Sequence, residues 1–147
     1  MWTRELAQKF EQVYCFEPNP NFIECFNKNI TESNVKLFEL GLSNKEHTAS
    51  QEFNSTQMTN TPANVQCRTL DSFNLNDIDF IKIDVDGFEA EVLEGAVGTI
   101  IRNNPVINVE IKKRKRPIVC MKIRKILWGL GYTQRKRIRS DEIWLKK

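Results

Sequence analysis

Short apolar runs alternate along this chain with amphipathic segments of helical period. The apolar runs have the length and composition of buried strands, and they cover residues 13–16, 35–42, 78–83 and 106–109. The amphipathic segments carry apolar residues three and four positions apart, which predicts helices at about 3–10, 20–30, 88–102 and 118–130. Strands that alternate with helices in this way predict an α/β fold with a doubly wound, mostly parallel sheet.

The segments between these elements complete the predicted fold. Residues 45–64 are polar and predict a hairpin or a mobile flap, and residues 65–70 predict another extended piece. Residues 132–138 and 142–145 predict an antiparallel pair that closes the C-terminal edge of the sheet. Asn19 and Pro20 form a helix start, whereas Pro105 and Gly131 follow helix ends. With 147 residues, we expect residues 1–147 to form a single domain.

The composition excludes several classes of protein. The chain is 40% hydrophobic, as a folded globular protein is, and no apolar run approaches the length of a membrane span. The N-terminus lacks the charged and then apolar layout of a secretory signal. The four cysteines are widely spaced and form no C-x-x-C pair, which favours reduced thiols over a disulfide framework or a zinc site. We therefore expect a cytoplasmic protein with no membrane partner.

Charge is distributed unevenly along the chain. Residues 1–111 contain 8 Lys or Arg against 17 Asp or Glu, while residues 112–147 contain 14 against 2. These opposite balances add up to the small net charge of +3. An acidic body therefore carries a basic C-terminal quarter, and this division needs an explanation.

Carboxylates end three of the predicted strands. Glu17 follows the first strand, Asp84 follows the run at 78–83, and Glu110 follows the run at 106–109. Ligands of open α/β sheets bind beyond the carboxyl ends of the strands, so these three acids predict a functional crevice. The alternative is that each acid only caps the helix that follows it.

Other kinds of site are less well supported. In the stretch that begins Asp84-Val85-Asp86-Gly87, the glycine comes fourth, whereas an EF-hand loop needs it sixth. A divalent ion held by Asp84, Asp86 and Glu110 is possible but not indicated, and we predict no metal site. His47 is the only histidine and lies in a polar segment, so most Ser-His or Cys-His triads are excluded. The candidate general bases are therefore carboxylates.

Several motifs in order resemble the FkbM family of S-adenosylmethionine-dependent methyltransferases. The chain reads F-E-P-N-P from Phe16, T-L-D from Thr69, and K-I-D-V-D-G-F-E from Lys82, where the family usually has K-I-D-V-E-G-x-E. The resemblance spans residues 13–111. It implies a Rossmann-like class I methyltransferase fold with S-adenosylmethionine as cofactor. It also implies methyl transfer to a hydroxyl oxygen of a sugar or another small acceptor.

The resemblance also assigns roles to individual residues. On the cofactor side, Glu17 would grip the two ribose hydroxyls with Asn19 beside it, and Leu42 and Ser43 would border the adenine. A carboxylate suits the ribose because it can accept from two vicinal hydroxyls. The acceptor side would include Asp84, Asp86, Glu89 and Glu110. Lys112 and Lys113, which follow directly and leave the sheet on the crevice side, are separately predicted to bind the substrate. The base that takes the acceptor proton would be Asp84 or Glu110, and the sequence does not separate the two.

One element of the family is not found in this sequence. The family begins with a strand and a glycine-rich turn that cradles the methionine end of the cofactor, and residues before Val13 do not match it. We therefore expect an N-terminally truncated domain. It would be a fragment, one part of a split protein with a complementing chain, or a degenerate copy. In each case we expect this chain alone to bind S-adenosylmethionine poorly.

The basic quarter leaves two alternatives open. Residues 112–116 and the cluster at 135–139 could recognise a polyanion, such as a phosphorylated or nucleotide-linked sugar, an acidic polysaccharide or nucleic acid. They could equally form a solvated surface that offsets the acidic body. No nucleic-acid-binding motif accompanies them. The competing function is thus a non-catalytic remnant that binds a polyanion or a partner chain, and a homo-oligomer is also possible.

Overall fold

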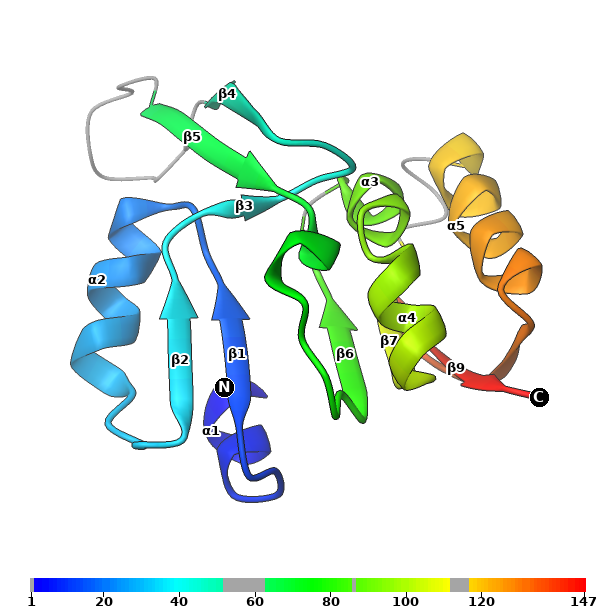
Figure 1. Cartoon of the computed structure of the whole chain (residues 1–147), viewed down its shortest axis with the longest axis horizontal. Coiled ribbons are helices and arrows are strands. Elements are labelled where there is room, and N and C mark those ends of the chain that lie inside the picture. The colour runs from blue at the N-terminus through cyan, green and yellow to red at the C-terminus, as the bar shows by residue number, and fades with distance from the viewer. Residues whose placement is uncertain (1, 52–62, 86, 112–116) are drawn as a thin grey trace. The chain divides into compact units, whose positions relative to one another are not determined.

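The computed structural model describes residues 2–51, 63–85, 87–111 and 117–147, and it has the predicted α/β character (Figure 1). The chain divides into two compact units. The first comprises Met1–Gly41 and Glu46–Cys67, and the second comprises Leu42–Lys45 and Arg68–Lys147. The expectation of a single domain stays a prediction.

The first unit contains a parallel pair of strands, β1 (Val13–Phe16) and β2 (Val35–Phe38). Their register runs from Val13 opposite Val35 to Phe16 opposite Phe38, and the rings of Phe16 and Phe38 stack with centroids 5.0 Å apart. Asn34, just before β2, donates from Nδ2 to the carbonyl oxygens of Ala7 and Phe10, each at 2.9 Å. These two bonds tie the segment after helix α1 (Trp2–Ala7) to the start of β2.

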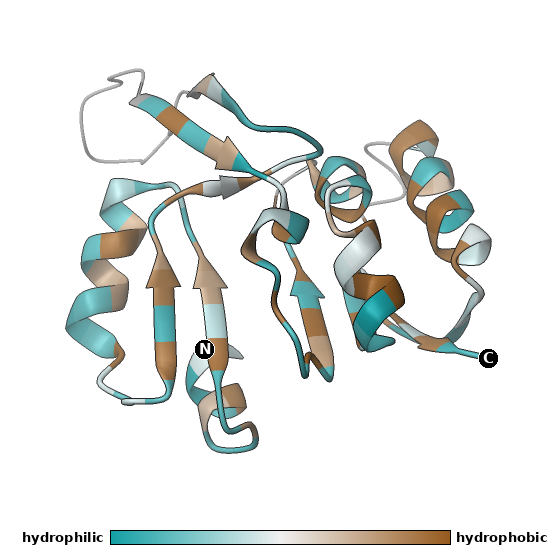
Figure 2. Ribbon diagram, in the orientation of Figure 1, coloured by the Kyte–Doolittle hydropathy of each residue, from teal (hydrophilic) through white to brown (hydrophobic). Residues whose placement is uncertain are grey.

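Helix α2 (Pro20–Asn29) begins as the sequence predicts. Asn19 is its N-cap and accepts a hydrogen bond from the backbone N–H of Asn21, and Pro20 occupies the first helical turn. Figure 2 shows apolar and polar positions alternating around this helix. The expected apolar face is nevertheless incompletely covered, because no residue of α2 is buried and Phe22 is 61% exposed.

The strand predicted at 35–42 is interrupted. It forms β2 and the two-residue strand β3 (Gly41–Leu42), with Glu39 and Leu40 between them. β3 joins a three-stranded sheet of order β3-β5-β4, in which β4 (His47–Gln51) and β5 (Ala63–Arg68) are antiparallel. The antiparallel pairing agrees with a hairpin for the polar region, although residues 52–62 lie outside the described residues. His47, in this polar segment, is the first residue of β4.

The second unit contains a mixed sheet of order β6-β7-β9-β8. β6 (Phe80–Ile83) and β7 (Val106–Glu110) are parallel, whereas β9 (Asp141–Lys146) runs antiparallel to both β7 and β8 (Tyr132–Ile138). The predicted antiparallel pair at the C-terminus is therefore confirmed. Because β9 is reversed relative to both neighbours, β8 points in the same direction as β6 and β7.

The long helix predicted at 88–102 is broken into α3 (Glu89–Glu94) and α4 (Val97–Asn103). The break lies at Gly95, where the backbone of Ser43 approaches so closely that a Cβ would lie 2.0 Å from the Ser43 carbonyl oxygen. Only glycine allows such an approach. The carbonyl oxygen of Gly95 then accepts the backbone N–H of Asp71 at 3.0 Å. Asp71 belongs to the 3-10 helix η1 (Leu70–Phe73).

The core of the second unit lies between one sheet face and the helices. Helices α3, α4 and α5 (Pro117–Gly129) contribute fully buried side chains, as do β7 and β9, and α4 lies in front of β7 in Figure 1. These side chains are Leu93, Ile100, Leu127, Ile107, Val109 and Trp144. Phe88 was expected on this apolar face, but it precedes the first turn of α3 and is 53% exposed.

Two further features of the second unit are the hydrogen bond of Tyr132 and the C-terminal end of α4. The hydroxyl of Tyr132 donates to the carbonyl oxygen of Pro105 at 2.9 Å, and burial raises the pKa of Tyr132 to about 12. Asn104 ends α4 in the left-handed conformation, with φ of 50°, at the position where the sequence predicts the helix to stop. No helix among the described residues combines the length and apolar character needed to cross a membrane.

Candidate active site

The structure brings Asp84 and Glu110 to the same edge of a sheet. β6 and β7 are parallel neighbours, with Ile83 opposite Val109, so the residues that follow Ile83 and Val109 leave the sheet side by side. Asp84 comes directly after β6, and Glu110 is the last residue of β7. Asp84 and Glu110 therefore lie at neighbouring carboxyl ends of parallel strands within the second unit, and the functional crevice expected from Glu17, Asp84 and Glu110 together stays a prediction.

A lysine on β6 stands between the acids of this edge. Lys82 has only 12% of its side chain exposed, and its Nζ lies 2.5 Å from Oδ1 of Asp141 and 3.6 Å from Oδ2 of Asp84. A cation in such a position needs anionic partners, because burial removes most of its hydration. The sequence offered one signal, a lysine inside the apolar run F-I-K-I. Its partner Asp141 is 59 positions away and was not predicted.

Glu110 is held by Ser140, which lies just before β9. Its Oε1 accepts a hydrogen bond of 3.1 Å from the hydroxyl of Ser140, and Glu110 lies opposite Asp141 in the register of β7 and β9. The carboxylates that follow β6, end β7 and start β9 are thus gathered at one edge. Within the described ranges, no three His, Cys, Asp or Glu side chains are arranged to hold a metal ion.

Glu89 forms a hydrogen bond with the backbone of Gly87, just before α3. Gly87 has φ of 113°, which favours glycine, and its backbone N–H donates to Oε1 of Glu89 at 2.9 Å. Glu89 is 5% exposed and is the first residue of α3, where a negative charge also interacts favourably with the helix dipole. The structure therefore gives this predicted substrate ligand a role in holding the backbone of Gly87. The predicted ligand Asp86 lies outside the described residues.

The predicted cofactor ligands Glu17 and Asn19 lie together at the carboxyl end of β1 in the first unit. The backbone N–H of Asn19 donates to Oε1 of Glu17 at 2.8 Å. Partial burial raises the pKa of Glu17, and this hydrogen bond opposes the increase. The amide side chain of Asn19, which is 8% exposed, is engaged as the N-cap of α2.

Leu42 and Ser43 lie where the chain enters the second unit. Ser43 is buried, and its backbone N–H donates to the carbonyl oxygen of Arg68 at 2.9 Å, while Leu42 is half-buried. The backbone of Ser43 is also the group that approaches Gly95. Ser43 therefore has a structural role beside the break between α3 and α4.

The T-L-D motif has a structural explanation that sequence reasoning missed. Thr69 caps η1 by accepting from the backbone N–H of Ser72, and Leu70 is buried. The carboxylate of Asp71 caps α4: it accepts from the backbone N–H of Gly98 at 2.9 Å, and from the backbone N–H and hydroxyl of Thr99 at 2.6 and 2.7 Å. A conformation with two helix caps accounts for this motif without a ligand.

With this geometry in place, comparison with known proteins decides the family. Residues 3–133 match the sequence model of the Methyltransferase FkbM domain. The chain belongs to the FkbM methyltransferase family. Among solved structures, the chain is similar to the crystal structure of Methyltransferase FkbM from Methylobacillus flagellatus KT, with a TM-score of 0.61 and 19% sequence identity. The match covers 92% of the present chain but 36% of that chain, so the likeness concerns the fold of one part of a longer protein. A search of curated proteins found no match.

The edge position of β8 accounts for some of the basic residues that follow the FkbM match. The match ends at residue 133, whereas Arg135 and Lys136 lie further along β8, the edge strand of its sheet. Both side chains are exposed, and the register of β8 shifts between Gln134 and Lys136. Charged side chains and β-bulges on an edge strand prevent it from pairing with other chains. Lys112 and Lys113, the predicted substrate ligands, lie outside the described residues.

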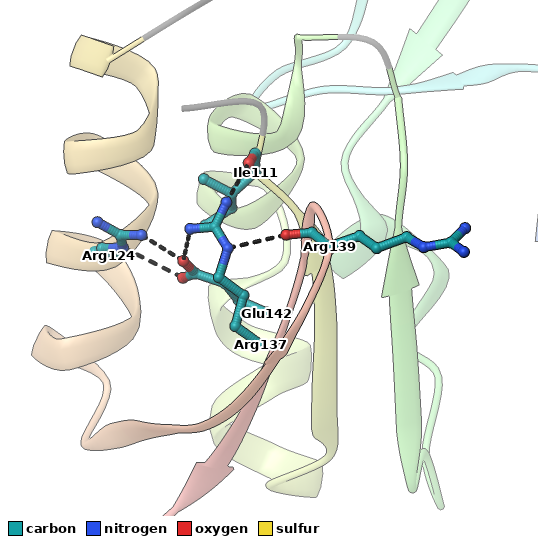
Figure 3. A network of polar contacts seen from close by, with 5 residues as sticks. All are labelled: Ile111, Arg124, Arg137, Arg139 and Glu142. Carbon is teal, nitrogen blue, oxygen red and sulfur yellow. Dashed lines mark hydrogen bonds and ion pairs between the residues drawn. The ribbon is translucent and has the colours of Figure 1, made fainter. Parts of the chain in front are cut away.

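Two other arginines of this FkbM-family chain surround a buried carboxylate (Figure 3). Glu142 is 0% exposed, and it accepts hydrogen bonds from Arg124 of α5 and from Arg137 of β8, the latter at 3.1 Å. The hydrogen bond to Glu142 raises the pKa of Arg124. Arg137 also donates from Nη2 to the carbonyl oxygen of Ile111 at 3.4 Å. This network joins α5, β8 and β9, and its role is structural.

Proposed function

We propose that this chain is a methyltransferase domain that uses S-adenosylmethionine to methylate a hydroxyl oxygen of a small acceptor, such as a sugar. The observation that carries the proposal is the placement of Asp84 and Glu110 at one edge of the β6–β7 pair in a chain of the FkbM family. The proposal includes a Rossmann-like, doubly wound arrangement of the whole domain. It also includes a cytoplasmic location, which suits the four free cysteines.

The residues of the first unit suit the cofactor's ribose. Glu17 is half-buried at the end of β1, and its Oε1 accepts from Asn19. Its Oε2 has no hydrogen-bond partner among the described residues, so this oxygen could accept from a hydroxyl group. Glu17 and Asn19 would hold the ribose, and Leu42 and Ser43 would border the adenine.

The residues of the second unit suit the acceptor. S-Adenosylmethionine, when bound, supplies an electrophilic methyl group attached to a sulfonium. Transfer of this group to the acceptor oxygen would release the hydroxyl proton, which must go to a base. Asp84 or Glu110 would take this proton. Lys82 contacts Asp84 directly, so it would help to hold that carboxylate in place.

Cofactor binding is tested by titration calorimetry of the full chain with S-adenosylmethionine. We expect weak but saturable binding, and we expect Glu17→Gln to weaken it by about ten- to a hundredfold, because hydrogen bonds to a charged acceptor are lost. Glu11→Gln makes the same chemical change at an exposed position and should leave binding unchanged. Absence of saturable binding, or equal effects of the two variants, would contradict the cofactor assignment.

Methyl transfer is tested with S-adenosylmethionine that carries a tritiated methyl group and a panel of sugars and sugar phosphates. We expect incorporation by the wild-type chain and a loss of about 10²–10⁴-fold in Asp84→Asn or Glu110→Gln, whichever residue is the base. Asp79→Asn, at an exposed position before β6, is the matched control. If neither variant loses activity relative to this control, neither carboxylate is the base.

A further inference from the structure

A two-residue turn connects β8 and β9 at the carboxylate edge. Ile138 and Asp141 form the last pair of the hairpin, so Arg139 and Ser140 make the turn. Arg137 donates from Nε to the carbonyl oxygen of Arg139 at 3.0 Å, and the backbone N–H of Ile111 donates to the carbonyl oxygen of Ser140 at 2.7 Å. These bonds fix the turn against the end of β7.

The conformation of Arg139 is unusual for its residue type. Its φ is 56°, in the left-handed region that glycine and asparagine adopt with least strain. A residue with a Cβ costs stability at such a position, because the Cβ crowds a backbone carbonyl oxygen. Residues in strained conformations of this kind are concentrated at functional sites. The left-handed conformation of Arg139 therefore favours a functional role for its side chain.

Neighbouring cations have partners, whereas the Arg139 side chain has none among the described residues. Arg124 and Arg137 both bind Glu142, and Lys82 binds Asp141. The guanidinium of Arg139 forms no hydrogen bond or ion pair with any described residue. Figure 3 shows its side chain extending away from the network around Glu142.

The turn also lies beside a predicted catalytic carboxylate. Ser140, the neighbour of Arg139, donates from its hydroxyl to Oε1 of Glu110 at 3.1 Å. A guanidinium in this position can form two parallel hydrogen bonds with a phosphate or a carboxylate. We propose that Arg139 binds an anionic group, a phosphate or a carboxylate, carried by the acceptor. The identity of the ligand as a methyl acceptor rests on the proposed function, but anion binding by Arg139 can be tested without it.

The first test measures anion binding directly. The ¹⁵N-labelled full chain is titrated with inorganic phosphate and, separately, with acetate at constant ionic strength, and the Arg139 Nε–H and Ser140 backbone signals are followed by NMR. We expect saturable shifts, a loss of about tenfold or more in affinity in Arg139→Gln, and a smaller loss in Arg139→Lys. Preference for one of the two anions identifies the group that the acceptor carries.

Arg135→Gln is the matched control, because it removes the same charge from an exposed position on β8. It should leave the binding of phosphate and acetate unchanged. The proposal is overturned if neither anion gives saturable shifts in the wild-type chain. It is also overturned if Arg135→Gln weakens binding as much as Arg139→Gln, since the effect would then reflect overall charge.

The second test concerns strain. We expect Arg139→Gly to raise the midpoint of urea unfolding above that of wild type and to abolish the saturable anion response. A lower midpoint would refute the premise that the arginine is retained at a cost in stability. Saturable phosphate binding through Arg139 without methyl incorporation into any acceptor would leave the anion site standing and remove the proposed methyl transfer.

Discussion

The cap that Asp71 provides to α4 allows a sharp test of the fold. Replacing Asp71 with Asn keeps the size and shape of the side chain but removes its charge and one of its two acceptor oxygens. The remaining oxygen can still serve the backbone N–H and hydroxyl of Thr99, now at 2.6 and 2.7 Å from Oδ1. The new amide group then faces the backbone N–H of Gly98, so two donors oppose each other where Oδ2 accepted at 2.9 Å.

The expected cost follows from these contacts. A hydrogen bond to a charged group contributes about 1.5–3 kcal/mol, and a negative charge at a helix N-terminus about 0.3–1 kcal/mol. Because Asp71 is partly exposed, water can replace some of this interaction, so we expect a loss near the lower end of the sum. The free energy of unfolding should fall by about 2–3 kcal/mol in Asp71→Asn. Asp71→Ala, which removes all three contacts, should lose more.

Urea unfolding followed by circular dichroism measures this change. Asp79→Asn is the control, because Asp79 is exposed, and its free energy of unfolding should stay within about 0.5 kcal/mol of wild type. The reasoning fails if Asp71→Asn is as stable as Asp79→Asn. It also fails if the backbone N–H of Gly98 exchanges with solvent no faster in Asp71→Asn than in wild type.

Three further predictions concern other parts of the chain. Glu142→Gln should lose about 2–3 kcal/mol in urea unfolding, because two arginines lose a buried carboxylate, and a loss below 0.5 kcal/mol would contradict the assigned network. Gly95→Ala should lose about 3 kcal/mol, because its Cβ would lie 2.0 Å from the Ser43 carbonyl oxygen. Gly129→Ala, with nothing within 4 Å, should gain up to about 1 kcal/mol, and equal effects of the two substitutions would be a refutation. Burial raises the pKa of Glu17, so the folded chain keeps this proton to higher pH than the unfolded chain, and the contribution of Glu17 to stability should fall as pH rises from about 4.5 through the folded pKa. Glu17→Gln should therefore gain stability relative to wild type across that window in urea unfolding at a series of pH values, and a constant difference would exclude the effect.

Local signals in the sequence were sufficient for much of the fold. The apolar run at 13–16 is β1, and Asn19 with Pro20 starts α2 as predicted. In these cases the deciding interactions lie within a few residues: a side chain caps the next turn, or a short apolar run ends at a proline. The same holds for the C-terminal pair β8 and β9, whose strands are joined by a short turn.

Contacts distant in sequence decided the elements that were predicted incorrectly. The pattern at 88–102 is continuous at helical period, but α3 and α4 separate because Ser43, more than fifty positions earlier, approaches Gly95. Glycine inside a helical pattern was the available signal. Phe88 fits the apolar stripe by spacing, but it lies before the first turn of α3, so its side chain is exposed.

In the candidate site too, general rules predicted some features, whereas contacts between residues distant in sequence decided others. The topological rule for parallel strands was enough to place Asp84 and Glu110 at one edge. The partners of this edge, Lys82 with Asp141 and Glu110 with Ser140, are 59 and 30 positions apart, and no local pattern links them. The geometry between Glu17 and the second unit stays a prediction.

The break at Gly95 has a consequence for the order in which the second unit folds. α3 has 6 residues and α4 has 7, whereas an isolated helix shorter than about 12–15 residues is marginal in water. We therefore do not expect either helix to form early from its own sequence. The carboxylate of Asp71 caps the N-terminus of α4, and the backbone of Ser43 packs against Gly95 at the break between the helices. Hydrogen exchange of α3, α4 and η1 should therefore proceed by one cooperative opening, and the hydrogen bond from Gly87 to Glu89 should form only when these elements are folded.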